Sequence, residues 1–549
     1  MQKRMTRLAR SALCFGLCLT ACGGRGFVRM PERPVVWEDD DRAPFSPRPP
    51  VRYVSWRGDA VDHLILRPAS EVWTLPVDVE AVNVNAWDEV PDSSWFHNRM
   101  GRHQLDPMDV ARAACDEVQP AVPTPWRVVG GKPDGSHPGL TIEDADGVRY
   151  LLKTDGELQP ERASAADAIG AALYWAAGYS TPCNRVHSVR REDLQLDPEA
   201  RVEMTSGAER ALTDADIEIV LRSAGHSPDG RFRVGLSRFF EHEPIGPWDY
   251  AGVLEADPND AVPHELRREL RGGYLLAAWT GHIDVRQENT LAVWHEVGDG
   301  VGFVEHRYVD FGDCFGVTIA NERMSRRFEH DHYLNLGNVL VDAVTLGAID
   351  RPWQHGRGGV GETLGFFDAE RFRPDEWAPG YPNPAFDART EHDDAWMARI
   401  LARFSPAHVQ AAVSVGQLSP PARRALVETL LERRRRILER YLTRLSPLAW
   451  PRSEAGRVCF EDMMVTAGLR AAEDRQYAAR LVASDPPRAP TPLEVGPGPC
   501  VTLPEGVGYL AIDVRTRTPG RDAPLPLRAH LYRGAVHGLE RLRDDGAPW

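Results

Sequence analysis

Strand-like and helix-like patterns of apolar residues alternate along the middle of this chain. Val148–Lys153, which follows an Asp-Gly turn, and Arg231–Phe240 alternate apolar and polar positions. This period of two predicts strands with one buried face. Thr290–Trp294 and Val301–Val309 flank the tripeptide Gly298-Asp-Gly300, and this arrangement predicts a hairpin.

Other segments repeat apolar residues every three or four positions, which predicts helices. They are Ala163–Ala177, Pro263–Gly281 and Asp393–Leu445. Gly178 and Pro182 follow the first of them and are typical stop signals for a helix. A strand-rich stretch, Val501–Arg543, predicts a small β module near the C-terminus. The mixture of strands and helices indicates the α+β class.

The first residues have the composition of an export signal. Basic residues precede the apolar run Ser11–Leu19, which is much shorter than the ~20 residues of a membrane-spanning helix. We therefore predict a signal peptide over residues 1–21. Leu19-Thr20-Ala21-Cys22 resembles the lipobox of bacterial lipoproteins, and this resemblance implies cleavage before Cys22 and acylation of that cysteine. An ordinary soluble export signal is the alternative.

Pro, Arg and Asp are frequent in residues 22–50, without periodicity. That composition predicts a disordered tether between the lipid and the folded chain. The expected location is the cell envelope, with the protein anchored in a membrane through Cys22 and facing the periplasm or the exterior. A cytoplasmic protein is the alternative if the first segment is not a signal.

Acidic residues outnumber basic ones over the whole chain. The sequence has 80 Asp and Glu against 65 Lys and Arg, a formal charge of −15. This excludes a general nucleic-acid binder, because such affinity comes from Lys and Arg that neutralise phosphates. Removal of the signal takes four basic residues away and leaves a charge of −19, so charge alone would not hold the protein on anionic lipids. Attachment would depend on the lipid at Cys22.

The cysteines suggest at most a partial disulfide framework. Three of the eight lie in the signal and lipobox, and five remain in the folded part: Cys115, Cys183, Cys314, Cys459 and Cys500. An odd number leaves at least one unpaired. No two of them form a C-x-x-C pair, so a zinc ribbon is not indicated. A bridge between Cys459 and Cys500 is compatible with the sequence.

Three polar motifs occur in a fixed order relative to the predicted elements. Lys153 ends a strand, the pair Asp284 and Asn289 forms D-x-x-x-x-N after a helix, and Asp310-Phe-Gly follows the hairpin. This order resembles the protein-kinase-like superfamily, in its atypical branch with HipA-like and phosphatidylinositol kinases, over residues 125–450. The resemblance implies a two-lobed fold with a β-rich N-lobe and a helical C-lobe.

The resemblance also implies a role for each polar residue in phosphoryl transfer, a reaction that depends on positioning and charge stabilisation. Lys153 would bind the phosphates of ATP, and Asp284 would orient or deprotonate the acceptor hydroxyl. Asn289 and Asp310 would hold Mg²⁺, which prefers oxygen ligands. Four glycines, whose spacing is not G-x-G-x-x-G, would let the backbone approach the phosphates: Gly130, Gly131, Gly135 and Gly139.

The helical partner of Lys153 stays open between two carboxylates. In HipA-like sequences a Glu stands eleven residues before the glycine that ends the helix, and here that position is Asp167, one methylene shorter. Asp167 is therefore included among the nucleotide-binding residues, and Glu161 is the alternative. His282 precedes Asp284 in an H-x-D arrangement, and we expect it to be structural rather than catalytic.

The expected domain order has five parts. They are a signal peptide (1–21), a tether (22–50), an N-terminal extension (51–124), a kinase-like domain (125–450) and a C-terminal β-rich module (455–549). The extension contains Asp88-Glu-Val-Pro-Asp-Ser-Ser-Trp95, which resembles a segment of uncharacterised bacterial proteins without an established function.

The predicted function is that of an exported, lipid-anchored kinase-like phosphotransferase. It would use ATP and Mg²⁺ to phosphorylate an unknown protein or small-molecule acceptor. Because little ATP is expected beyond the inner membrane, the alternative is a pseudokinase-like binding or scaffold lipoprotein of the envelope that does not catalyse transfer. The sequence contains neither G-x-S-x-G nor H-E-x-x-H, so α/β-hydrolase and zincin chemistry lack support.

Overall fold

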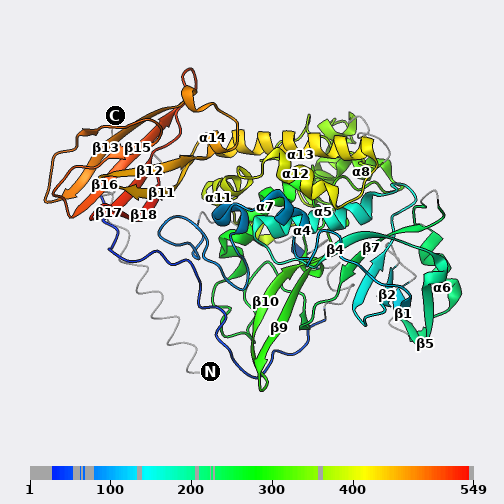
Figure 1. Ribbon diagram of the computed structural model, residues 1–549. Coiled ribbons are helices and arrows are strands. Elements are labelled where there is room, and N and C mark those ends of the chain that lie inside the picture. The colour runs from blue at the N-terminus through cyan, green and yellow to red at the C-terminus, as the bar shows by residue number, and fades with distance from the viewer. Residues whose placement is uncertain are drawn as a thin grey trace, which may run out of the picture.

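Strands and helices are combined in an α+β fold, as the sequence predicts (Figure 1). The computed structural model describes residues 27–53, 62, 66–67, 79–132, 139–203, 209–222, 224–226, 229–355 and 363–542. In Figure 1 the helices α7, α11, α12 and α13 lie between a sheet at the right and the C-terminal strands at the left.

The largest sheet has the strand order β4-β7-β3-β2-β1-β5-β6. Its strands are β1 Trp126–Lys132, β2 Gly139–Glu143, β3 Arg149–Lys153, β4 Asn184–Val189, β5 Leu194–Glu203, β6 Glu209–Ala211 and β7 Phe232–Arg238. The apolar residues of β3 alternate, so that Tyr150 and Leu152 are buried in a core shared with helix α6 (Asp214–Arg222). Lys153 consequently points away from that core.

Helix α5 (Arg162–Ala177) follows β3 and packs on β4 and β7. A Cβ at Gly235 of β7 would lie 3.3 Å from the backbone of Ser164, so the absence of a side chain permits this close approach. The observed helix matches the prediction over residues 163–177 and ends at Gly178 in a positive-φ conformation.

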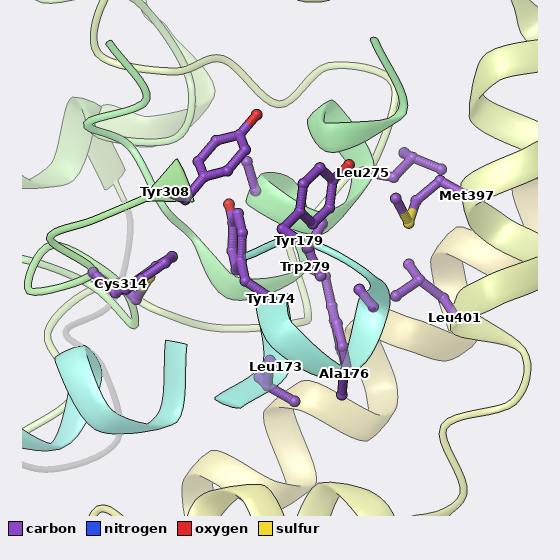
Figure 2. Packing of buried hydrophobic residues seen from close by; sticks show 14 of the residues in the cluster. Leu173, Tyr174, Ala176, Tyr179, Leu275, Trp279, Tyr308, Cys314, Met397 and Leu401 are labelled. Carbon is purple, nitrogen blue, oxygen red and sulfur yellow. The ribbon is translucent and has the colours of Figure 1, made fainter. Parts of the chain in front are cut away.

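The helical part has its own large core. Its principal helices are α4 Pro107–Arg112, α7 Arg268–Thr280, α11 Glu391–Leu401, α12 Pro406–Ser414 and α13 Pro420–Tyr441. The segment predicted as helical from residue 393 to 445 is thus three helices, because Pro406 and Pro420 each begin a new one. In Figure 2, Tyr174 of α5, Trp279 of α7 and Met397 of α11 lie in one apolar cluster.

A hairpin connects the two polar motifs of the central segment. Strands β9 (Thr290–Gly298) and β10 (Val301–Tyr308) pair antiparallel, and β8 (Glu243–Gly246) adds to β9. The hairpin agrees with the prediction from Gly298-Asp-Gly300, whose Asp299 adopts a positive φ of 52°. Asn289 immediately precedes β9 and Asp310 follows β10, so the hairpin fixes the distance between them.

Residues 27–50 lie against the folded chain. The prediction of a disordered tether is therefore wrong for this segment. The Asp41 carboxylate is buried and accepts hydrogen bonds from the N–H and hydroxyl of Ser94, and the N–H of Phe45 donates to the carbonyl of Gly302. Single side chains with buried partners, rather than a periodic pattern, hold this segment, and such contacts leave no signature in the composition.

The segment around Asp88 in the N-terminal extension joins distant parts of the chain. The Asp88 carboxylate contacts Arg268 of α7, lies 3.2 Å from Arg399 of α11 and lies 2.8 Å from Arg541 of the last strand. Burial raises the pKa of Asp88, but the three guanidinium charges together outweigh it and hold that pKa well below its usual range. This conspicuous acidic segment therefore has a structural role.

The C-terminal module contains a three-stranded and a five-stranded sheet. Its strands are β11 Leu448–Glu454, β12 Arg457–Asp462, β13 Gln476–Asp485, β14 Pro492–Leu493, β15 Cys500–Thr502, β16 Tyr509–Arg517, β17 Leu527–Tyr532 and β18 Ala535–Arg541. Because β11 pairs with β12, the module begins at Leu448 and not at residue 455. The possible bridge between Cys459 and Cys500 is present.

A second disulfide joins Cys115 and Cys183, and Cys314 is a buried free cysteine. The remaining short helices are α8 Glu322–Arg327, α9 Leu336–Thr345, α10 Pro384–Asp387, α14 Met463–Thr466, η2 Arg99–His103, η3 Arg191–Asp193, η4 His264–Leu266, η5 Gln287–Asn289, η6 Pro352–His355 and η7 Ala472–Asp474. Within the described ranges, every helix is too short or too polar to cross a membrane.

Candidate functional site

Lys153 forms an ion pair at the end of β3. Its Nζ lies 2.9 Å from Oδ1 of Asp310, although the two residues are far apart in the sequence. Burial lowers the pKa of Lys153, but the negative charges of Asp310 and Asp167 outweigh this effect and raise the pKa above its ordinary value. The lysine is therefore positively charged at neutral pH.

Asp310, the second residue after β10, occupies a strained backbone position. Its φ is 57°, a left-handed conformation that aspartate adopts more readily than most residues. The next residue, Phe311, is fully buried, and a Cβ at Gly170 of α5 would lie only 2.6 Å from the Cβ of Phe311. Gly170 thus lets α5 approach the segment that carries Asp310.

Asp167 connects α5 with the same segment. Its Oδ1 accepts a hydrogen bond of 2.9 Å from the backbone N–H of Phe311. Burial raises the pKa of Asp167, while the charge of Lys153 opposes this rise. Glu161, the alternative from the sequence, instead accepts a hydrogen bond from the N–H of Ser419 and belongs to a different contact.

Asp284 and Asn289 lie in the loop between α7 and β9. The side-chain amide of Asn289 donates hydrogen bonds to the backbone carbonyl of Asp284 at 2.7 Å and to its Oδ2 at 2.9 Å. Nε of Arg286 lies 2.8 Å from the other carboxylate oxygen. Burial first, and then the negative charge of Asp313, raise the pKa of Asp284 to about 7, while Arg286 lowers it.

His282 is buried beneath this loop. Its Nδ1 lies 2.9 Å from the hydroxyl of Tyr174, and burial lowers its pKa to about 4. The imidazole is therefore neutral at pH 7. These contacts agree with the structural role that we expect for His282 from the sequence.

A pocket of about 360 Å³ brings the polar residues together with apolar walls. Lys153, Asp167, Asn289 and Asp310 line it. Leu151, Pro182, Phe239, Phe240, Leu291 and Val309 are among its apolar lining residues. Charged, aliphatic and aromatic side chains thus line one pocket, and such a mixed lining is typical of small-molecule sites.

Of the four predicted glycines, the three that the structure describes, Gly130, Gly131 and Gly139, do not line this pocket. Gly130 and Gly131 lie in β1, and a Cβ at Gly131 would come within 3.0 Å of the carbonyl of Gly139 and of Leu140. Gly139 is similarly crowded by the carbonyl of Leu152. Close strand packing therefore accounts for Gly131 and Gly139, whereas a Cβ at Gly130 would meet no atom closer than 3.6 Å. The contact of these glycines with phosphate stays a prediction. Gly135 and Cys22 lie outside the described residues.

The donor atoms near the pocket fit Mg²⁺. Asn289 uses its amide N–H groups on Asp284, so its side-chain oxygen remains as an acceptor, and Asp310 offers a carboxylate. These are the hard oxygen ligands that Mg²⁺ prefers, usually together with waters and substrate phosphates. In the part of the chain that the structure describes, no group of three or more His, Cys, Asp or Glu side chains is arranged to hold a metal alone.

Sequence reasoning missed several neighbours of the site. Phe239 and Phe240 follow β7 and line the pocket, and their position as two consecutive aromatic residues at a strand end is a signal that could have been used. Tyr333 lies near Asp284 and Asp313: burial raises its pKa most, and these two negative charges raise it further. Nothing in the local sequence around Tyr333 indicates this proximity.

Comparisons with known proteins give little direct guidance. No family model and no curated protein matches the sequence. Among solved structures, the Golgi casein kinase with Mn/ADP bound is 9% identical with a TM-score of 0.28, covering 65% of this chain and 77% of that chain. Another structure of the Golgi casein kinase is also 9% identical, with a TM-score of 0.25, and covers 58% and 73% respectively. With such low values, functional inference depends on the site itself.

Proposed function

We propose that this protein is an exported, lipid-anchored kinase-like phosphotransferase that uses ATP and Mg²⁺. The observation that carries the proposal is the 2.9 Å ion pair between Lys153 and Asp310, on a pocket that Asn289 also lines. Asp284 adjoins it through its hydrogen bonds with Asn289. Four residues from three separate segments of the sequence thus lie close together. They are the four polar residues to which the resemblance to the protein-kinase-like superfamily gives a role.

The chain's own groups suit the transfer of a phosphoryl group. Lys153 binds phosphate oxygens through its positive charge, and the apolar walls bind the base. Asp284 orients the acceptor hydroxyl and accepts its proton. Asn289 and Asp310 hold the metal, which when bound neutralises charge on the phosphates.

The proposal includes a two-lobed arrangement around the pocket. The seven-stranded sheet and the helical part each have a separate apolar core. The pocket is lined by Lys153 of β3 together with Asn289 and Asp310, which flank the β9–β10 hairpin. Residues of the seven-stranded sheet and of the helical part thus line the same pocket. This arrangement supports the proposal of a β-rich N-lobe and a helical C-lobe on either side of a nucleotide.

Membrane attachment through Cys22 remains part of the proposal. Only four residues separate Cys22 from Phe27, whose ring lies 5.9 Å from that of His530 in the C-terminal module. The five steps along the chain from Cys22 to Phe27 span at most about 18 Å, so an acylated Cys22 would hold the module close to the lipid surface. Cys22→Ser is expected to move the protein from the membrane to the soluble fraction, and unchanged fractionation would contradict the lipid anchor.

Calorimetric titration with ATP and Mg²⁺ tests the nucleotide site in the full chain carrying Cys22→Ser. Asp310→Asn should weaken the binding of ATP with Mg²⁺ at least about tenfold, because it removes a charged ligand. Asp299→Asn is the matched control, since Asp299 has a similar positive φ but lies in the hairpin turn. Equal affinity in wild type and Asp310→Asn would place the nucleotide elsewhere.

A binding protein without catalysis is the second candidate. It is favoured by one observation: Lys153 pairs with Asp310, whereas the α5 carboxylate of Asp167 bonds to the backbone of Phe311. In active protein kinases the lysine pairs with the helix carboxylate. Transfer of radiolabelled phosphate that is lost in Asp284→Asn, with ATP binding retained, would exclude this candidate. Absence of any transfer despite ATP binding would favour it.

A further inference from the structure

The five-stranded sheet of the C-terminal module carries aromatic side chains on the face that points away from the module's main core. Tyr509 of β16 lies opposite Tyr532 of β17, and Ala511 lies opposite His530, so these four side chains share one face. Tyr509, Ala511 and Tyr532 form a small cluster of their own, while the residues that alternate with them belong to the main core. All four side chains are buried, so another part of the chain covers this face.

Residues 27–33 provide the cover. In Figure 1 the blue start of the described chain lies beside β17 and β18. The ring of Phe27 stacks on that of His530, with the ring centroids 5.9 Å apart, and the sulfur of Met30 occupies the place that a Cβ at Gly538 would take. Among the described residues, no backbone-to-backbone hydrogen bond joins residues 27–33 to the module. Recognition of this segment therefore depends on side chains and not on an added strand.

Arg29 lies over two tyrosine rings of this face. Its guanidinium carbon is 4.1 Å from the ring centroid of Tyr509 and 5.0 Å from that of Tyr532. Its Nε donates a hydrogen bond of 3.0 Å to the hydroxyl of Tyr532, and its Nη1 lies 3.5 Å from the carboxylate of Asp485. The same hydroxyl donates to the backbone carbonyl of Met30. We call Tyr509, Tyr532 and Asp485 the Arg29 site.

The Arg29 site suits arginine better than lysine. A planar guanidinium can stack on aromatic rings while its N–H groups donate to a hydroxyl and a carboxylate, whereas an ammonium offers no plane and a single donor centre. The bound segment is also superficial, because the side chain of Arg29 is 46% exposed and Phe27 is 40% exposed. The segment can consequently leave the face without opening the main core of the module.

We propose that the C-terminal module is a peptide-binding domain and that residues 27–33 of this chain are its resident ligand. The peptide that it recognises is extended and has an aromatic residue two positions before an arginine. Phe27 and Arg29 supply these two side chains. The module thereby acts as a clamp on the N-terminal segment, and the clamp can open.

Opening of the clamp would change how far the protein extends from a membrane. This consequence rests on the proposed lipid at Cys22, but recognition of the segment does not. With the segment bound, the five steps from Cys22 to Phe27 span at most about 18 Å. With it released, the next aromatic contact along the chain is that of Trp37, whose ring stacks on Trp450 at 6.1 Å, and the 15 steps from Cys22 to Trp37 span at most about 54 Å.

Fluorescence polarisation with a labelled synthetic peptide of residues 27–33 tests recognition by the module. The peptide is titrated with the full chain carrying Cys22→Ser, with and without the pair Phe27→Ala and Arg29→Ala. A segment tethered to its own site has an effective concentration in the millimolar range, so the peptide should bind the chain with the vacated face at least about tenfold more tightly. A peptide with Arg29→Lys should bind that chain at least about tenfold more weakly. Absence of binding to the vacated face, or equal affinity for both chains or of both peptides, would overturn the proposal.

Trypsin cleavage after Arg29 measures release of the segment in the full chain carrying Cys22→Ser. Tyr532→Phe keeps the ring but removes the hydroxyl that bonds to Arg29 and Met30, and it should speed this cleavage at least about threefold. Tyr477→Phe is the matched control, since the hydroxyl of Tyr477 donates to Asp462 in the same module. An unchanged rate in Tyr532→Phe, or an equal increase in both variants, would refute the clamp. Neither experiment involves a nucleotide, so the clamp and the proposed activity can fail separately.

Discussion

The carboxylate of Asp167 accepts a hydrogen bond from the backbone N–H of Phe311 and thereby ties α5 to the residue after Asp310. This contact fixes the segment on which Asp310 adopts its left-handed conformation. A longer glutamate is the usual partner of the lysine in protein kinases, and here the shorter side chain bonds to backbone instead. Asp167 is therefore a positioning residue for Asp310.

Substitution of Asp167 separates hydrogen bonding from charge. Asp167→Asn retains an oxygen that accepts from Phe311, so ATP affinity in Mg²⁺ should stay within about threefold of wild type, whereas Asp167→Ala should lose about tenfold. Calorimetric titration measures both. An equal loss of ATP affinity in the two variants would show that the negative charge facing Lys153, and not the hydrogen bond to Phe311, determines ATP affinity.

The pH dependence of phosphate transfer should follow Asp284. Its pKa is raised to about 7, first by burial and then by the charge of Asp313. Because the deprotonated carboxylate accepts the proton of the acceptor, the initial rate should rise from about pH 6 to about pH 8 and then level off. Arg286 lowers this pKa, so Arg286→Gln should move the profile to higher pH.

The control for this profile is Arg127→Gln. Arg127 makes exposed ion pairs with Glu143 and Asp197 at the edge of β1, away from the pocket lining. Arg127→Gln should leave the midpoint of the pH profile unchanged. A rate independent of pH in wild type, or an identical midpoint in Arg286→Gln, would argue against Asp284 as the proton acceptor.

The arginine contacts of Asp88 should be worth several kcal/mol. The Asp88 side chain is 12% exposed, and Arg268, Arg399 and Arg541 surround it. Asp88→Asn removes the carboxylate that these three guanidinium groups share, while Arg268 keeps its ion pair with Asp393 and Arg399 keeps its ion pair with Glu89. We expect it to lower the free energy of unfolding by about 3 kcal/mol. Urea denaturation at pH 7 measures this, with Asp299→Asn as the control for an aspartate at positive φ.

The sign of the pH effect on that stabilisation follows from the depressed pKa of Asp88. The contribution is present above the pKa of an unfolded aspartate, about 4, and is lost as the pH falls through the folded pKa. The stability difference between wild type and Asp88→Asn should therefore shrink below about pH 4. A difference that stays constant down to pH 2 would mean that packing, not charge, accounts for the loss.

Local patterns in the sequence were sufficient to place the parts of the site that lie at element ends. Alternation and turn residues place Lys153 at the end of β3 and Asn289 and Asp310 on either side of the hairpin, and the resemblance to the protein-kinase-like superfamily singled them out as site residues. The choice between Asp167 and Glu161 did not follow from such patterns, because it depends on which way α5 faces. The packing of residues 27–50 and the disulfide between Cys115 and Cys183 were missed for the same reason: both depend on contacts between distant segments.

Gly170 provides a test of how closely α5 must approach Phe311. A Cβ at this position would lie 2.6 Å from the Cβ of Phe311 and 3.3 Å from Sγ of Cys314, so Gly170→Ala must displace one of them. The displacement moves Asp310 away from Lys153, and ATP affinity in Mg²⁺ should fall at least about tenfold while the fold is retained with a stability loss of about 1–3 kcal/mol. Gly156→Ala is the control, since a Cβ there meets no atom within 4 Å. Titration and urea denaturation of both variants check this, and a Gly170→Ala protein with normal ATP affinity would show that the position of Phe311 does not control the site.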